Sequence, residues 1–373
     1  MKKTPKEFAT EPIVYAVRDT YQILVPVKCE TVMWVEVGGQ RFYDDSNGIL
    51  RSASSTHKMT VPAKLLDRER KYTVCYRVIN QRKPYFTDAG EVERYESSFR
   101  PVGASPVHIY HIADAHNAVN RPVAAASVFD GKLDLLILNG DIPNHSGNIE
   151  YFTTIHEIAS RLTHGEIPVV FSRGNHDTRG IFAEKIEEHT PTDNGRSYYT
   201  FRVGGIWGIV LDCGEDKSDE HKEYGHTICC EDFRRRETEF IKQVIENRRD
   251  EYEAEGVENR LVICHVPFTQ KFEPPFDIEE DVYREWSSLL RDYIKPQLML
   301  CGHTHNAYIS RVGCEKDYTG QPCTVVVASK TNRKEKGSTY YGGALTLYKD
   351  SCNVKITGSD NSLLFEENIE FLV

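Results

Sequence analysis

The sequence of 373 residues predicts an α/β protein with a smaller all-β region in its first hundred residues. Three observations support this fold class. Short segments rich in Val, Ile, Tyr and Thr fill the N-terminal region, predicted strands and helices alternate through the middle, and strands return near the end. Hydrophobic residues make up 39% of the chain and charged residues 27%, which is typical of an ordinary soluble globular protein.

The first hundred residues are predicted to form a small β-sandwich. Turn residues separate short apolar segments, and residues 70–78 alternate as a half-buried strand does. Pro101, Gly103 and Pro106 indicate a linker, so we divide the chain into a sandwich domain, 1–104, and a second domain, 105–373. The strands predicted in the sandwich are Ile13–Val17, Gln22–Val27, Val32–Val37, His57–Val61 and Tyr72–Ile79.

The second domain alternates strands with helices and ends in a run of strands, which predicts sheets covered by helices. Three helices are predicted because apolar residues recur on one face, at Ile149–Leu162, Glu231–Asp250 and Asp281–Tyr293. The strands are predicted at Val107–Ala113, Leu133–Leu138, Pro168–Phe171, Ile206–Leu211, Leu261–Cys264, Gln297–Leu300, Tyr308–Val312, Thr324–Ala328, Ala344–Leu347 and Cys352–Ile356.

The net charge of −10 is unevenly distributed along the chain. Residues 1–105 hold 17 Lys or Arg and 13 Asp or Glu, whereas residues 106–373 hold 29 and 43. Such an acidic second domain is poorly suited to bind a polyanion, so we expect no nucleic-acid partner. No apolar stretch approaches the roughly 20 residues of a membrane span. We therefore expect no membrane partner and, because no signal peptide is recognised, a cytoplasmic location.

The ten cysteines are scattered, and no CxxC spacing occurs among them. Two of them lie inside apolar runs, which indicates buried, reduced thiols rather than a disulfide framework. A pair between Cys314 and Cys323 is the alternative to free thiols on a hairpin.

Five polar clusters follow five predicted strands. Because ligands bind at the carboxyl ends of strands in open α/β sheets, we expect these clusters to converge on one rim. Glycine before three of them permits a sharp turn and a close approach of the backbone. The clusters are Asp114-Ala115-His116, Gly140-Asp141, Gly174-Asn175-His176-Asp177, His265 and Gly302-His303-Thr304-His305.

The spacing within the clusters suits metal binding. Alternate residues just beyond a strand, such as Asp114 and His116 or His303 and His305, can turn their side chains to the same side. Asp141 stands alone, and its two oxygens suit it to bridge two ions. Imidazole and carboxylate together favour Zn, Fe or Mn over Mg or Ca. Each cluster alone has a structural explanation, such as a turn or a core histidine, but the ordered set indicates a metal site.

These motifs are identified as those of the calcineurin-like metallophosphoesterase superfamily, over about residues 107–310. The resemblance implies a four-layer α/β/β/α core with two central mixed sheets. It also implies a metal-dependent phosphoric ester hydrolase with two divalent transition-metal ions, Mn, Fe or Zn. One ion is expected on Asp114, His116 and His305, the other on Asn175, His265 and His303, with Asp141 as the bridge.

The resemblance also implies catalytic roles. His176 is expected to face the substrate phosphate, as an acid or as a stabiliser of transition-state charge, and Asp177 to orient its ring through the other nitrogen. Near the motifs, Arg173 and Arg179 are candidates for a guanidinium clamp on the phosphate, and Asn117 for a further contact. Each of these three is alternatively an ordinary loop residue. The polar loop 213–225 is either a lid over the site or an ordinary solvent-exposed loop.

The order of a sandwich followed by a catalytic domain also resembles the purple acid phosphatases, which place a fibronectin III-like domain first. Two positions depart from that subfamily. His116 stands where its first motif has glycine, and Asn144 stands where its iron-binding tyrosine would be. We therefore expect no tyrosinate-to-iron colour and no obligate ferric ion.

The expected activity is hydrolysis of a small-molecule phosphate monoester, in which a metal-bridging hydroxide attacks phosphorus. The alternatives are a phosphodiesterase on cyclic nucleotides or other small diesters and, in another class, a partner-binding protein that uses the sandwich. The acidic second domain argues against a nuclease. No oligomeric state is predicted.

Overall fold

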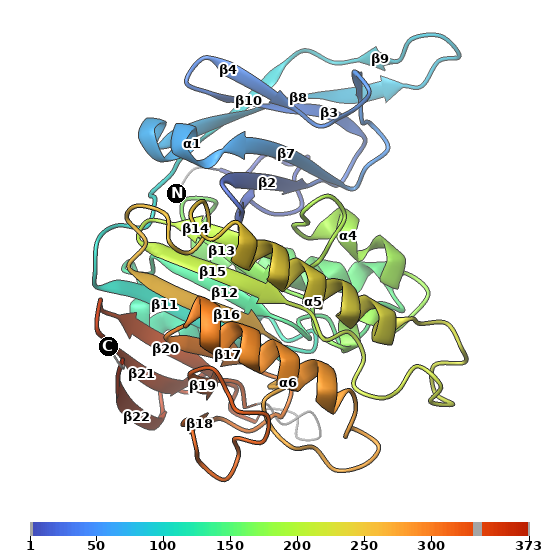
Figure 1. Cartoon of the computed structure of the whole chain (residues 1–373). Coiled ribbons are helices and arrows are strands. Elements are labelled where there is room, and N and C mark those ends of the chain that lie inside the picture. The colour runs from blue at the N-terminus through green and yellow to red at the C-terminus, as the bar shows by residue number, and fades with distance from the viewer. Residues whose placement is uncertain (1–2, 331–337, 372–373) are drawn as a thin grey trace.

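The computed structural model describes residues 3–330 and 338–371, in which a β-rich N-terminal region lies against a layered α/β core (Figure 1). Two large sheets form the centre of the described core. One has nine strands, in the order β22-β21-β20-β11-β12-β13-β1-β2-β7, and the other has six, in the order β14-β15-β16-β17-β19-β18.

The nine-stranded sheet is mixed. β11, β12 and β13 are parallel to one another, and the C-terminal strands join antiparallel beside β11. The bounds of its strands are β22 (Leu363–Glu370), β21 (Ser351–Gly358), β20 (Tyr341–Leu347), β11 (Val107–Ile112), β12 (Leu135–Asn139), β13 (Pro168–Ser172), β1 (Ile13–Val17), β2 (Thr20–Pro26) and β7 (Thr56–Pro62).

The six-stranded sheet has four parallel strands, β15, β16, β17 and β19, with antiparallel β14 and β18 at its edges. Its parallel strands are buried almost throughout, which explains why they read as continuous apolar runs in the sequence. The bounds are β14 (Tyr199–Val203), β15 (Ile206–Leu211), β16 (Asn259–Cys264), β17 (Leu298–Cys301), β18 (Tyr308–Ser310) and β19 (Thr324–Val327).

Alternate residues of each strand enter different hydrophobic cores, which produces the four layers. In β12, Ile137 packs between the two sheets, whereas Leu136 and Leu138 pack in the core on the helix side. That outer face is covered by α2 (Asn120–Ala125) and α3 (Thr153–Thr163). The six-stranded sheet is covered by α5 (Cys230–Glu246) and α6 (Glu280–Leu289) (Figure 1). The expected α/β/β/α order is confirmed.

The helices α5 and α6 follow the predicted apolar periodicity, and they also contact each other. In α5, Ile241 and Val244 are buried against the sheet. Trp286 of α6 is buried, and its Nε1 donates to Thr238 Oγ1 of α5 at 2.8 Å. The helix predicted to reach Tyr293 ends earlier, because a π-helical turn follows at Leu290–Ile294. Shorter helical pieces are Ala126–Phe129, Ile149–Phe152, His176–Thr178, Ala183–Lys185 and α4 (Ile186–His189).

The N-terminal region is a β-sandwich, and one of its two layers is the end of the core sheet. Met33 and Val74 lie in the sheet that forms the other layer, and they pack in the same hydrophobic core as Ile23 of β2 and Met59 of β7. The elements of this region that lie outside the core sheet are β3 (Thr31–Val37), β4 (Gln40–Tyr43), β5 (Asp45–Ser46), β6 (Ile49–Leu50), α1 (Ala63–Glu69), β8 (Lys71–Gln81), β9 (Asp88–Ala89) and β10 (Glu93–Ser98).

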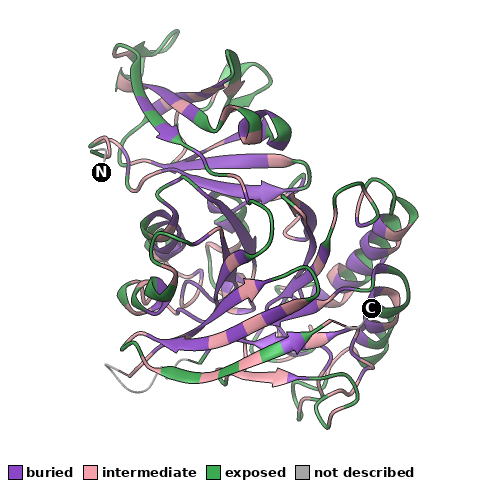
Figure 2. Cartoon of the chain, turned by 90° about the vertical axis from the view of Figure 1, so that its left-hand side faces the viewer, coloured by how far each residue is buried: buried purple, intermediate pink, exposed green. Residues whose placement is uncertain are grey.

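The predicted boundary between residues 104 and 105 therefore does not divide the nine-stranded sheet, which contains strands from both sides of it. β1 pairs in parallel with β13, with Val14 opposite Pro168, so the first strands extend the core's own sheet. All five residues of β1 are buried, as an interior strand requires, and the junction is among the buried parts of the molecule (Figure 2). This long-range pairing leaves no mark in the local alternation of the sequence.

All ten cysteines are free thiols, and Cys314 and Cys323 are not bonded to each other. Among the described residues, no helix combines the length and the apolar character needed to cross a membrane.

The shared sheet predicts that the two stretches of chain do not fold separately. A fragment of residues 105–373 would expose the edge of β13 and the apolar residues that pack against β1 and β2, so we expect it to be insoluble or to lack a cooperative unfolding transition. Thermal unfolding followed by circular dichroism, with the full chain as control, measures this. A soluble fragment that unfolds cooperatively would contradict the shared-sheet account.

Candidate metal centre

The five polar clusters lie together at one rim of the core. β11, β12 and β13 of the nine-stranded sheet are parallel, so the segments after their ends leave at the same edge. β16 and β17 of the other sheet are also parallel, and the histidines after them reach the same place. Contacts of 4.0 Å or less link side chains from four of these segments, those after β11, β12, β16 and β17. The expected convergence of strand ends is therefore present.

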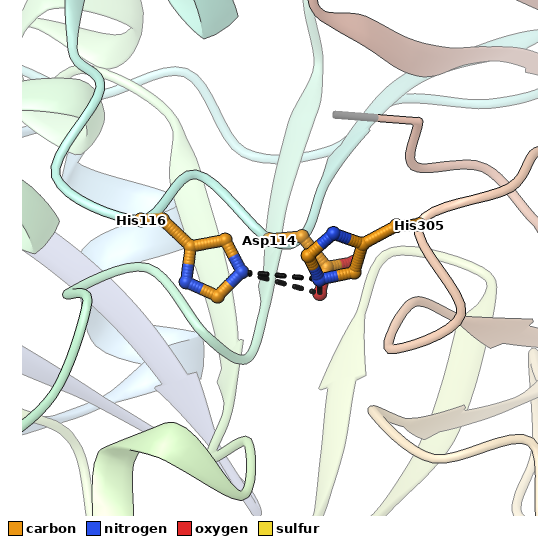
Figure 3. Close-up of side chains that lie close together, drawn as sticks. All are labelled: Asp114, His116 and His305. Carbon is orange, nitrogen blue, oxygen red and sulfur yellow. Dashed lines mark hydrogen bonds and ion pairs between the residues drawn. The ribbon is translucent and has the colours of Figure 1, made fainter. Parts of the chain in front are cut away.

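The first group of potential ligands is Asp114, His116 and His305 (Figure 3). His305 Nε2 lies 3.2 Å from Asp114 Oδ1 and 3.2 Å from His116 Nε2. His116 Nε2 lies 3.8 Å from the same Asp114 oxygen. Two imidazole nitrogens and one carboxylate oxygen thus face a common point, as expected for one metal ion.

Asp141 lies between this group and the next. Its Oδ2 is 3.4 Å from His265 Nε2, and Asp114, Asp141 and His265 present ligand atoms that all lie within 4.8 Å of one another. Its Oδ1 accepts the backbone N–H of His176 at 2.8 Å. One oxygen of the carboxylate is therefore held by a hydrogen bond, and the other oxygen faces the neighbouring ligand, an arrangement that suits a bridging ligand.

The remaining predicted ligands, Asn175 and His303, contact each other. His303 Nδ1 lies 3.1 Å from Asn175 Oδ1, and the His303 ring packs edge-on against His265, with centroids 5.6 Å apart. The backbone N–H of His303 donates to Asp114 Oδ2 at 2.9 Å, which ties this group to the first. All seven predicted ligands thus belong to one connected cluster.

The chemistry of the cluster fits divalent transition-metal cations. Asp114 Oδ1 and His265 Nε2 are buried and have no hydrogen-bond partner among the described residues, although they face other ligand atoms. His265 Nδ1 lies 2.6 Å from the carbonyl oxygen of Asn139 and donates to it, which leaves Nε2 as a lone-pair donor for a metal. Burial alone raises the pKa of Asp141, but His265 and the other imidazoles outweigh it and hold that pKa below its ordinary value.

The ligand turns have an unusual backbone. Asp114, His116, Asp141, His303 and His305 all have φ between 45° and 67°, a region that costs residues other than glycine free energy. The surrounding sheets must therefore hold the ligands in place. Space is equally restricted, because a Cβ built on Gly174 would lie 2.4 Å from Asp141 Oδ1. Gly140 has no room either, since its Cβ would meet the His265 ring at 2.5 Å.

His176 lies at the edge of the cluster, and its orientation differs from the prediction. Its Nδ1 lies 2.9 Å from the backbone carbonyl oxygen of Asn144, so this carbonyl, not Asp177, orients the ring. The carboxylate of Asp177 instead accepts the backbone N–H groups of Gly174 at 2.7 Å and Asp141 at 3.3 Å. The side chain turns inward to these two backbone donors, and it thereby stabilises the tight turns that carry the ligands.

The predicted substrate contacts have different outcomes. Arg173 forms an ion pair with Asp212, with Nε 2.6 Å from Oδ2, and its guanidinium lies over the ring of Phe233, so it is engaged away from the ligand cluster. Asn117 Oδ1 accepts the backbone N–H of Asn144 at 2.9 Å, and it therefore supports the loop that orients His176. Both side chains are thus engaged within the protein, and their contact with a substrate stays a prediction.

Arg179 does reach the site. Its Nη1 lies 3.2 Å from His176 Nε2, while Glu215 and Asp216 bind the guanidinium at 2.7 and 3.1 Å. The ion pairs outweigh its partial burial and raise the pKa of Arg179 above its ordinary value, so the guanidinium is charged.

Sequence reasoning did not single out Glu215 and Asp216 as site residues. They lie in the polar loop 213–225, and Arg234, which is fully buried, fixes its start by donating to the carbonyls of Cys213 and Glu215. The beginning of the loop is thus a fixed part of the site wall, neither a mobile lid nor an ordinary solvent-exposed loop. Its position directly after β15 was the available signal, because the other site residues also follow strands.

The cluster predicts that metal binding depends on Asp141. We expect Asp141→Asn, which keeps the shape but removes the charge and one carboxylate oxygen, to lower the amount of metal bound per chain at least about twofold. Elemental analysis of the purified variant measures this. Glu215→Gln is the matched control, since Glu215 is equally buried but binds Arg179, and it should retain its metal. Full metal content in Asp141→Asn would refute the assigned role.

Comparisons with known proteins agree with this geometry. Residues 107–307 match the family model of the calcineurin-like phosphoesterases. The fold resembles a purple acid phosphatase from yellow lupin (Lupinus luteus) seeds, with a TM-score of 0.59 and 12% identity over 96% of this chain and 74% of the other. It also resembles PhoD, with a TM-score of 0.59 and 11% identity over 100% of this chain and 94% of the other. Compared with curated protein sequences, the chain has no significant match.

The family match covers more than half of the chain and includes the five ligand clusters after their strands. The expected resemblance is thereby confirmed, as is the prediction of an enzyme. The chain belongs to the calcineurin-like phosphoesterase family and is a metal-dependent phosphoester hydrolase.

Proposed function

We propose that this chain is a dinuclear phosphatase that hydrolyses the monoester of a small molecule. The observation that carries the proposal is the position of His176 and Arg179 at the edge of a complete ligand cluster. His176 Nε2 lies 3.9 Å from the bridging Asp141 and 3.2 Å from Arg179 Nη1, so a phosphoryl group held by the cluster would meet both side chains.

The two ions would be held by the ligands that the motifs predict. Asp114, His116 and His305 form one site, Asn175, His265 and His303 form the other, and Asp141 is shared. Mn, Fe and Zn all suit this mixture of imidazole, carboxylate and amide ligands. When bound, such a pair of ions polarises the phosphoryl group and supplies a hydroxide nucleophile at neutral pH.

His176 is suited to transfer a proton at Nε2. Because Nδ1 donates to the carbonyl of Asn144, the ring is fixed and Nε2 points toward Arg179 and Asp141. With Nδ1 as a donor, Nε2 accepts the N–H of Arg179 Nη1. To act as an acid, the ring takes up a second proton at Nε2 when a phosphoryl group replaces Arg179 as its partner. This proton would pass to the leaving oxygen of the ester, or would stabilise the charge on the phosphoryl oxygens. Asn117 supports this arrangement by accepting the N–H of Asn144.

A small substrate fits the charge of the chain. Residues 106–373 carry 29 basic and 43 acidic side chains, which opposes binding of a nucleic acid along the surface. Arg179 is itself neutralised by Glu215 and Asp216, so the positive charge near the ligand cluster is local. We therefore propose a single phosphoryl group on a small organic molecule as the substrate.

The test combines substrate choice with one substitution. With Mn(II) added, we expect the wild-type chain to hydrolyse 4-nitrophenyl phosphate with a higher kcat/KM than bis(4-nitrophenyl) phosphate. His176→Ala should lower kcat for the monoester by about 10²- to 10⁴-fold, because the proton donor is lost, while the metal content stays unchanged. Steady-state kinetics and elemental analysis on the same preparations measure both.

Tyr85→Ala serves as control, because Tyr85 is 92% exposed in the N-terminal region and should leave kcat unchanged. Preference for the bis ester would favour the diesterase alternative. Loss of metal from His176→Ala would show that His176 is a ligand and would contradict its role as a proton donor.

A further inference from the structure

A pocket of about 280 Å³ lies directly beside the metal centre. One side of it is formed by His303 and by the acidic wall of Glu215 and Asp216. The other sides are largely aromatic, and we call this cavity the aromatic pocket. Its ring-bearing residues are Phe268, Phe272, Phe276, Tyr283 and Tyr318.

The aromatic pocket is continuous with the ligand cluster through shared residues. Phe272 packs edge-on against the ring of His303, with centroids 5.9 Å apart. Asp216, which also lines the pocket, accepts at Oδ2 from Asn175 Nδ2 at 3.3 Å. Asp216 also binds Arg179, which lies against His176. A phosphoryl group bound between His303 and His176 would therefore have the mouth of the pocket within reach of its organic substituent.

The loop that follows His265 forms most of this pocket. It carries Phe268, Phe272 and Phe276, so the strand that delivers a metal ligand also delivers the pocket wall. Phe276 is 38% exposed, and Phe272 is half-buried. Apolar side chains that remain exposed around a cavity next to a reaction centre are typical of a ligand site.

The charges around the pocket favour a neutral occupant. Arg179 and Lys217 neutralise Asp216. The lining also includes Lys271, but its charge is outnumbered by the carboxylates of Glu215, Asp216, Asp277 and Glu280, which opposes a second phosphate. A positively charged occupant is also disfavoured, because cations of the chain already lie near two of the rings. The Nζ of Lys217 is 5.0 Å from the centroid of Phe276, and that of Lys271 is 5.7 Å from Tyr318.

We propose that the aromatic pocket binds the organic part of the phosphate ester and selects an uncharged aromatic or branched apolar alcohol. This inference rests on the proposed function, since it assigns the substrate class of the same site. The volume suits a single ring better than a nucleotide or a sugar bisphosphate. Transfer of one aromatic ring from water into such a pocket raises kcat/KM by about 10- to 100-fold.

The experiment compares two alkyl phosphates whose leaving alcohols have similar reactivity, 2-phenylethyl phosphate and ethyl phosphate. With Mn(II) present, we expect the wild-type chain to prefer the phenylethyl ester by about 10- to 100-fold in kcat/KM. Phe276→Ala, at the exposed rim, should lower kcat/KM for the phenylethyl ester at least about threefold more than kcat/KM for ethyl phosphate. Phe272→Ala should act in the same direction.

Phe86→Ala is the matched control, because Phe86 is 81% exposed and lies in the N-terminal region, outside the lining of the pocket. Hydrolysis of both esters with equal kcat/KM, or an equal loss for both in Phe276→Ala, would overturn the pocket assignment while the proposed function stands. Hydrolysis of neither ester by a metal-loaded chain would overturn the proposed function, and the pocket assignment with it.

Discussion

The structure depends on the close approach of two buried carboxylates, Asp114 and Asp141. Both are almost inaccessible to solvent, and their oxygens lie within 4.8 Å of each other and of His265. Two negative charges at that distance repel each other by about 3 kcal/mol, even at an effective dielectric constant of ~20. Desolvation adds to this cost, so the site is stable only where positive charge compensates it. The surrounding imidazoles, and the divalent ions that the family uses, supply that compensation.

The fold supplies the rigidity that this arrangement needs. Ligands come from both central sheets, and the hydrophobic core between the sheets fixes the distance between them. Five ligand residues adopt a left-handed backbone. Asp177 accepts the backbone N–H of one of them, Asp141, and that of Gly174 in the neighbouring turn. The N-terminal sandwich contributes by extending the same sheet through β1 and β13. Stability of the outer strands and geometry of the metal centre are thus linked by one continuous sheet.

The sequence was sufficient to predict that the candidate ligands meet at one rim, because each follows a strongly apolar strand and the rule that strand ends converge is general. It also predicted the helices α3 and α5 from their periodicity. Contacts that depend on tertiary structure were not predictable. The Asn144 carbonyl that orients His176 belongs to the backbone and has no residue-type signal. The ion pair of Arg173 was not predicted either, because its partner, Asp212, lies 39 positions away, just after a strand of the other sheet.

The most direct test of the two-metal account is anomalous diffraction from crystals grown with Mn(II) or Zn(II). The account predicts two peaks about 4 Å apart, one beside Asp114, His116 and His305 and the other beside Asn175, His265 and His303, with Asp141 between them. A single peak, or two peaks that Asp141 does not join, would contradict it.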